Sequence, residues 1–228
     1  MKEATIVIAQ KIEIAMILPT MTYQEIEKTF RREIATAIPK IDEVAKRFGR
    51  MVKTTYRYPL TREFLVQTKD RTKLNLLFVA DKRSSWDHPK LCIYSTFQYK
   101  DGLYAISVPG GEGDAHILTK HFFDRYRERI VKDSEMGAED LIRRYMINNK
   151  DMGWFPNASI FSADYQKYEK EGTLQLAARV VEGNCFAEQI GRRLFLIRTI
   201  LPDDMLGESQ AEAFAVTEKL RREASPFA

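Results

Sequence analysis

The sequence has little of what disulfide-rich, metal-binding or membrane proteins require. It contains 228 residues and only 2 cysteines. Cys92 and Cys185 are too few for a disulfide framework and lack paired metal-ligand spacing, so we interpret them as buried thiols of a reduced compartment. Lys11 and Glu13 interrupt the apolar N-terminal run, and no apolar stretch approaches the ~20 residues that a membrane helix needs. We therefore expect an unprocessed cytoplasmic protein with no membrane partner.

A large excess of charge of one sign is also missing. There are 36 Lys and Arg residues against 32 Asp and Glu residues, which leaves a net charge of +4. This charge is too small to show that the partner is a nucleic acid, but it allows one if the positive residues are clustered. A composition of 44% hydrophobic and 30% charged residues indicates one sizeable core.

The first clear element is a helix. Thr22 and Glu25 have the spacing of a capping box, which predicts a helix start at this point. Apolar residues follow at helical spacing: Ile26, Phe30, Ile34 and Ile38. We expect Pro39 to break this helix, and a second short helix at 41–48 to end at Gly49, the residue type preferred after a helix end.

The pattern then changes to short β-rich runs. The runs predicted as strands are 53–58, 63–68, 74–80, 91–99 and 103–108. Asp101-Gly102 is a turn signal that joins the last two runs as a hairpin. An antiparallel meander follows from these runs.

The second half alternates helices and strands. We predict a helix around His121, a helix at 138–149, and strands at 174–181 and 192–201 on either side of a turn at Gly183-Asn184. The prediction is a single α+β domain over residues 1–228, with an antiparallel β-sheet, a helical N-terminal region and additional helices packed on the sheet. Its parts are the helical N-terminal region 1–50, the antiparallel strands 51–110, the helix-helix-hairpin portion 114–201 and the C-terminal helix 207–224.

His121, Arg125 and Arg129 are four residues apart and form one polar stripe if their segment is helical. The apolar residues Phe122 and Tyr126 place this stripe at the border of the buried face, where a groove wall would lie. Guanidinium groups hold phosphate in bidentate fashion, and an imidazole exchanges a proton near pH 7. The stripe therefore suits a phosphate-rich ligand.

A simpler interpretation of the same helix stays open. Lys120 with Asp124, Arg125 with Glu128, and Glu128 with Lys132 have the spacing of surface ion pairs, each worth ~0.2–0.5 kcal/mol. The stripe is then one side of a charged amphipathic helix.

A second cluster of positive residues lies between Val44 and Arg62, where no acidic residue occurs. Aromatic residues are interleaved with the cations, as a single-stranded nucleic-acid surface requires. The candidate nucleic-acid-binding residues are Lys46, Arg47, Arg50, Lys53, Tyr56, Arg57 and Tyr58. In the alternative interpretation, Tyr56 and Tyr58 pack one face of a strand while the cations solvate the other.

Two further features offer weaker signals. Arg198 lies near the end of an apolar strand and must reach a partner, which is either an anion shared with Arg125 and Arg129 or a nearby acid. His88, beside Pro89 and near Trp86, lies in a loop, and Trp154-Phe155-Pro156 forms another; each is either an aromatic ligand contact or an anchor of an exposed loop. We expect no metal and no other cofactor, because Glu112, Asp114, His116 and His121 match neither an H-E-x-x-H helix nor a facial triad.

The order of elements from 114 to 201 resembles a class of small bacterial domains. A strand and turn lead into a helix that begins His-x3-Arg-x3-Arg, and a second helix and a hairpin ending in Arg-Thr follow. This order is similar to that of RelE-type toxins and, more widely, of the barnase–EndoU–colicin superfamily of metal-independent ribonucleases. The resemblance implies that His121 is the base and that Arg125, Arg129 and Arg198 hold the phosphate.

The same resemblance implies a general acid, for which Tyr145 and His116 are candidates. It predicts an RNA-binding protein, or one that binds a phosphate ligand, with metal-independent endoribonuclease activity and an origin in a bacterial toxin or mobile element. The alternative is a non-catalytic structural or interaction protein that docks RNA or another polyanion. A third hypothesis, an enzyme for a phosphorylated small molecule, predicts a closed pocket around Arg125 and Arg129.

Overall fold

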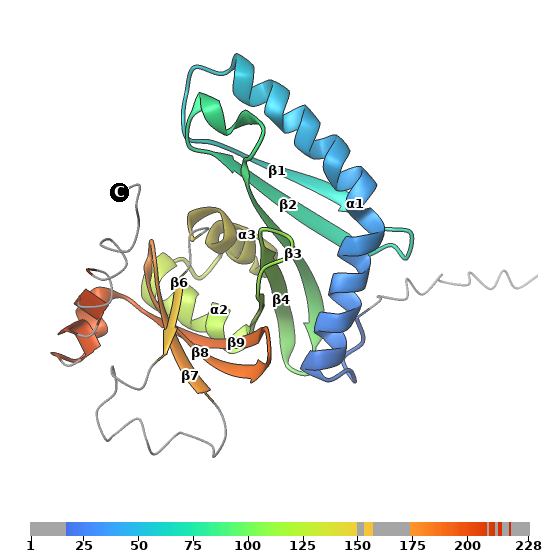
Figure 1. The fold of residues 1–228 in the computed structure, drawn as a ribbon. Helices are drawn as coiled ribbons and strands as arrows, with labels where there is room; N and C mark the ends of the chain where they lie inside the picture. The colour runs from blue at the N-terminus through green and yellow to red at the C-terminus, as the bar shows by residue number, and fades with distance from the viewer. Residues whose placement is uncertain are drawn as a thin grey trace, which may run out of the picture.

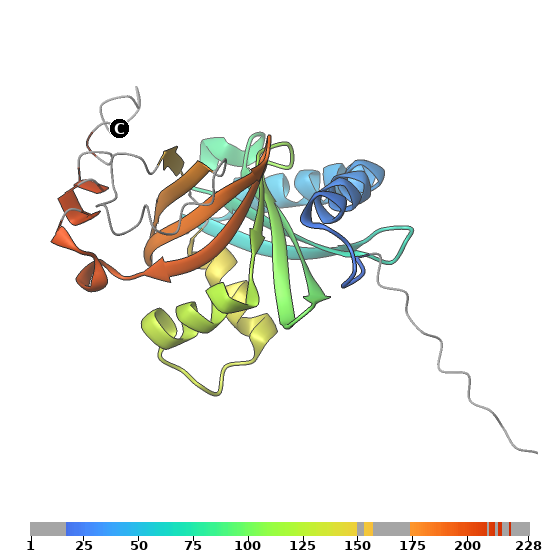
Figure 2. The same cartoon turned by 90° about the horizontal axis from the view of Figure 1, so that it is seen from below.

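The computed structural model describes residues 17–149, 153–156, 174–208, 210–212, 214–215 and 219. A 9-stranded sheet runs in the order β1-β2-β3-β4-β5-β9-β8-β7-β6 (Figure 1). One long helix covers one face of the sheet and two shorter helices cover the other (Figure 2). The predicted α+β class, with helices packed on a mostly antiparallel sheet, is confirmed.

The strands are β1 (Leu60–Gln67), β2 (Lys73–Ala80), β3 (Lys90–Tyr99), β4 (Gly102–Pro109), β5 (Ala115–Leu118), β6 (Gly153–Pro156), β7 (Leu174–Val180), β8 (Gly183–Gly191) and β9 (Leu194–Leu201). Neighbouring strands are antiparallel except for β5 and β9, which pair in parallel. This parallel pair joins the β1–β4 meander to the strands of the second half. The helices are α1 (Tyr23–Thr54), α2 (Lys120–Tyr126) and α3 (Ala138–Asn148). Short helical turns are η1 (Arg83–Trp86), the π turn η2 (Arg127–Val131) and η4 (Asp203–Met205).

Helix α1 confirms the predicted start and overturns the predicted end. The Thr22 hydroxyl accepts from the Glu25 N–H at 3.3 Å, and the Glu25 carboxylate accepts from the Thr22 N–H at 2.7 Å, which completes the capping box. The helix then passes through Pro39 and Gly49 to Thr54, so the predicted break, the predicted end and the strand at 53–58 are wrong.

Packing explains why α1 continues. Its buried residues include Ile34, Ile41, Phe48 and Val52, which extend the apolar stripe onto the core under β1 and β2. Burial of these side chains outweighs the local cost of ~3 kcal/mol for proline and ~1 kcal/mol for glycine inside a helix. Gly49 serves close packing, because a Cβ there would lie 2.5 Å from the Trp86 carbonyl oxygen.

The strand prediction missed β8. We expected Gly183-Asn184 to be the turn, but the turn lies at 181–182 and Gly183 begins β8. Gly183 has φ +155°, and a Cβ there would lie 2.7 Å from the Leu201 carbonyl oxygen. The glycine therefore marks a close strand pairing. Of the predicted C-terminal helix, residues 208, 210–212, 214–215 and 219 are helical, and the rest lies outside the described residues.

The core has two main parts. Under α1, the apolar residues of that helix pack on one face of β1–β5 and on the adjoining part of β9. On the opposite face, the Tyr145 ring packs edge to face on Phe122 and on Tyr126, with centroid distances of 4.9 Å and 5.3 Å. This aromatic cluster belongs to the core that packs α2 and α3 on the face formed by β2–β5 and β7–β9.

Glu33 of α1 leads to a stability prediction. Its side chain lies in the core with 1% of the residue exposed, and neither carboxylate oxygen has a hydrogen-bond partner among the described residues. Because a buried polar group without partners is costly, we expect Glu33→Met to raise the free energy of unfolding by about 1–3 kcal/mol. Urea unfolding measures the change. Glu33→Gln is the control and should gain less, because its amide also lacks partners. A Met variant no more stable than the parent would show that Glu33 has a partner in solution.

Candidate functional site

One position of the predicted stripe, Arg125, is occupied by an ion pair, and a second pair lies beside the stripe on α2. The Arg125 guanidinium lies 2.6 Å from the Glu128 carboxylate, and Lys120 lies 2.5 Å from Asp124. His121 is exposed. The charged amphipathic helix that we kept as the simpler interpretation is therefore what the geometry shows. Such exposed pairs contribute little to stability.

Arg129 is hydrogen-bonded to the sheet. Its guanidinium donates to the Thr199 hydroxyl at 3.2 Å and to the Ile200 carbonyl at 3.0 Å. These bonds tie the π turn η2 to β9. Arg129 thus has a structural role, and two of its donor interactions are already used.

Arg198 does not join Arg125 and Arg129. It forms a bidentate pair with Glu188, with both nitrogen–oxygen distances at 2.8 Å. Glu188 is the register partner of Leu196, which packs in the core under α1, on the sheet face opposite α2. Burial raises the pKa of Tyr23 on α1, and Arg198 is close enough for its charge to oppose this shift. The shared anion site with Arg198 is therefore not formed, and pairing with an acid is the outcome.

The two candidate acids lie inside the protein. Tyr145 is buried in the aromatic cluster, with its hydroxyl 3.4 Å from the Cys185 sulfur. His116 is buried in β5, and burial lowers its pKa to about 4, which keeps the imidazole neutral at pH 7. Neither side chain can contact an RNA strand without unfolding of the core.

Within the described part of the chain, no group of three or more His, Cys, Asp or Glu side chains is arranged to hold a metal ion. Both cysteines are free thiols. No helix among the described residues is long and apolar enough to cross a membrane.

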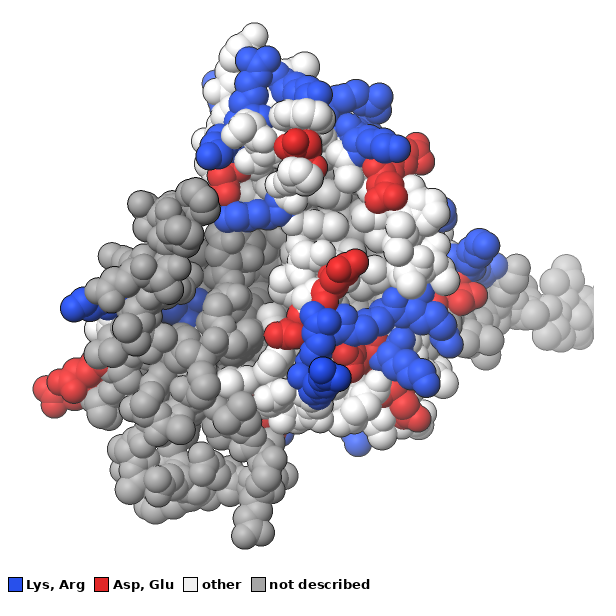
Figure 3. Space-filling model, in the orientation of Figure 1, with Lys and Arg blue, Asp and Glu red and all other residues white. Residues whose placement is uncertain are grey.

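The second predicted cluster forms a continuous surface. We call it the basic surface, and its residues are Lys46, Arg47, Arg50, Lys53 and Arg57 from α1 and the loop after it, with Lys82 and Arg83 at η1. All of these side chains are exposed. Positive side chains gather at the top of the molecule, around the end of α1 (Figure 3).

The basic surface differs from the α2 stripe in its partners. Among the residues that the structure describes, no carboxylate forms an ion pair with Lys46, Arg50 or Arg57. Arg125 and Arg198, by contrast, are each held by a glutamate. Cations without acidic partners leave their charge available to an external anion.

Comparison with models of protein families, with curated proteins and with solved structures gave no match. The functional assignment therefore rests on the chemistry of the surface.

The aromatic residues of the basic surface have separate roles. Tyr56 is 96% exposed and carries a free ring face. The Tyr58 hydroxyl donates to the Val52 carbonyl at 2.5 Å and caps the end of α1, so Tyr58 is structural. The Arg47 guanidinium lies 5.7 Å from the Phe64 ring centroid. Because this segment is helix and loop, the alternative in which both tyrosines pack one face of a strand is wrong.

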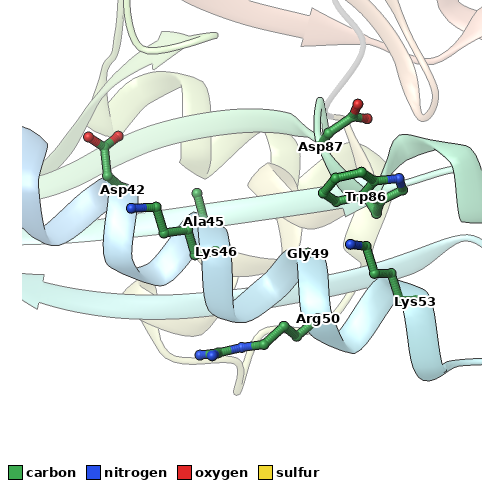
Figure 4. A pocket seen from close by; sticks show the side chains of 8 residues that line it. All are labelled: Asp42, Ala45, Lys46, Gly49, Arg50, Lys53, Trp86 and Asp87. Atoms are coloured by element: carbon green, nitrogen blue, oxygen red, sulfur yellow. The ribbon is translucent and has the colours of Figure 1, made fainter.

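A pocket of about 400 Å³ opens on the basic surface, between α1 and η1 (Figure 4). Its lining residues are Asp42, Ala45, Lys46, Gly49, Arg50, Lys53, Trp86 and Asp87. Trp86 brings an aromatic ring from a segment more than thirty residues away from α1. The loop tryptophan was noted in the sequence, but its position beside α1 was not predictable from spacing.

A second pocket of about 380 Å³ lies on the opposite side of the sheet, at β1, β3 and α3. There Glu63 accepts a hydrogen bond from the Tyr94 hydroxyl and pairs with Arg143. Burial and the bond to Glu63 raise the pKa of Tyr94. Its lining has three carboxylates, Glu63, Glu139 and Asp140, against the two cations Lys73 and Arg143, so this pocket suits a polyanion less well.

Proposed function

We propose that the protein binds a nucleic acid through the basic surface. One observation carries the proposal: exposed Lys and Arg side chains cluster at the end of α1 and at η1 without ion pairing to a described carboxylate. Lysine and arginine are the side chains that neutralise phosphates, and arginine can do so in bidentate fashion. The exposed ring of Tyr56 adds a face on which a base can stack.

The geometry gives less support to RNA cleavage. In the ribonuclease hypothesis, His121, Arg125, Arg129 and Arg198 surround one phosphate. Arg198 is on the other face of the sheet, and Arg125 and Arg129 already have protein partners. Binding without cleavage is therefore the function we propose, and cleavage is tested separately below.

The test is salt-dependent binding to labelled single-stranded RNA, followed by fluorescence anisotropy. Because each phosphate contact in single strands contributes ~0.7 to the slope of log affinity against log salt, loss of three contacts should reduce this slope by about 2. We expect this reduction, with weaker binding at low salt, for the triple variant Lys46→Gln, Arg50→Gln, Arg57→Gln.

The matched control removes the same charge elsewhere. Lys28, Lys69 and Arg192 are also exposed and lie outside the basic surface, so their triple glutamine variant should keep the parental slope. Equal loss in the two triple variants, or no salt-dependent binding by the parent, would refute the proposal. The RNA from these reactions is then run on a denaturing gel. Cleavage that His121→Ala abolishes would restore the ribonuclease hypothesis.

A further inference from the structure

The pocket between α1 and η1 is a slot with small residues on one side and an aromatic side chain on the other. Ala45 and Gly49, one helical turn apart, provide a floor without long side chains. Trp86 stands above Gly49, with Lys46 and Lys53 on either side along the helix (Figure 4). The missing side chain at Gly49 allows the η1 backbone to approach α1, since a Cβ would meet the Trp86 carbonyl.

Trp86 is an unusual side chain for this position. Trp86 is 43% exposed, whereas tryptophan, which has the largest side chain, is highly buried on average. The volume of about 400 Å³ falls within the range of small-ligand pockets, about 300–1,000 Å³. A base stacked on an aromatic side chain gains ~1–3 kcal/mol, whatever its sequence, because every base has a π face.

The charges around the slot fit the rest of a nucleotide. The Lys53 ammonium lies over one face of the Trp86 ring, 3.3 Å from its centroid, so a base that stacks on this face displaces the ammonium and brings its own phosphate close to it. Lys46 offers a second cation from the neighbouring turn. The carboxylates of Asp42 and Asp87 also line the pocket and can accept hydrogen bonds from amino or hydroxyl groups of a nucleoside.

We infer that the Trp86 pocket holds one unpaired base of a single-stranded nucleic acid. This inference rests on the proposed function and extends it, because cations alone bind duplex and single strands alike, whereas a stacking slot requires an unstacked base. The protein therefore prefers single strands over duplexes.

The test compares two substitutions of Trp86 on matched ligands. Trp86→Leu removes the aromatic face, and Trp86→Phe keeps one. We expect Trp86→Leu to weaken binding of a single-stranded oligonucleotide by about 5- to 150-fold, and Trp86→Phe to weaken it much less. An abasic strand of equal length keeps the phosphates and lacks the bases, so its affinity should be the same for all three proteins. Thermal melting confirms that each variant is folded.

A direct readout comes from the ring itself. In a Trp154→Phe background, Trp86 is the remaining tryptophan, and its fluorescence should be quenched by the oligonucleotide but not by the abasic strand. Unchanged affinity and fluorescence, in a protein that still shows salt-dependent binding, would overturn the stacking site and leave the proposed function standing. A parent protein without any salt-dependent binding would overturn both.

Discussion

Replacement of Phe48 by alanine should lower the free energy of unfolding by about 3–5 kcal/mol, the usual cost of removing a buried phenylalanine side chain. Phe48 is fully buried in α1. Its ring stacks on Phe78 with centroids 5.2 Å apart and meets Phe64 edge to face at 6.4 Å. These contacts hold the C-terminal half of α1, and with it the basic surface, on β1 and β2.

Equilibrium urea unfolding measures this loss. Ile38→Ala is the control in the same helix, since Ile38 is 50% exposed and loses less buried area. Its effect should stay below about 1 kcal/mol. If the two variants lost equal stability, the C-terminal half of α1 would not pack on the sheet as described. The RNA-binding surface would then lack its scaffold.

Helix α1 shows how far local sequence signals predict structure. Thr22 and Glu25 predicted the start of α1 correctly, because a capping box involves residues only three positions apart. Pro39 and Gly49 predicted breaks that did not occur. The packing that overrides them joins Phe48 to Phe78, thirty positions later, and no spacing rule in the sequence reveals that contact.

The candidate site likewise has one part that the sequence predicts and another that depends on tertiary contacts. The run of cations from Lys46 to Arg57 was visible in the sequence, because its residues are neighbours along one helix and the following loop. Trp86 joins them through a tertiary contact at Gly49, which local pattern does not predict. For Arg198, the sequence did not decide between an anion and an acidic partner, for a similar reason. The face to which it points depends on the sheet topology and on a bulge in the β8–β9 register.

A partly buried carboxylate connects the elements of the other half of the protein. Glu182, in the turn between β7 and β8, has a side chain only 16% exposed. Its carboxylate accepts hydrogen bonds from the Tyr126 hydroxyl at 2.5 Å, from Asn148 at 3.0 Å and from Asn149 at 2.8 Å. Arg144 adds a charged contact at 3.4 Å. One turn residue thus joins α2, α3 and the β7–β8 hairpin.

We expect Glu182→Ala to cost about 3 kcal/mol of stability. Removal of the carboxylate leaves the buried Tyr126 hydroxyl and the two asparagine amides without their acceptor, and an unmet donor costs more than a hydrogen bond contributes. Urea unfolding gives the value. Glu182→Gln keeps the shape and one acceptor oxygen, and should lose about 1–2 kcal/mol. A loss within error for Glu182→Ala would show that water replaces the carboxylate in solution.

The pH dependence of stability tests whether the charge of Glu182 contributes to these contacts. Burial alone would raise the pKa of Glu182, but hydrogen bonds from Tyr126, Asn148 and Asn149 and the charge of Arg144 hold this pKa below the ordinary value of 4.5. A lowered pKa means that the carboxylate stabilises the fold above the ordinary pKa and loses this effect as pH falls through the folded-state pKa. The stability difference between the parent and Glu182→Gln should therefore be constant near neutral pH and shrink below about pH 4.5. If the difference stayed constant into the acid range, the stabilising effect of Glu182 would not depend on its ionised form.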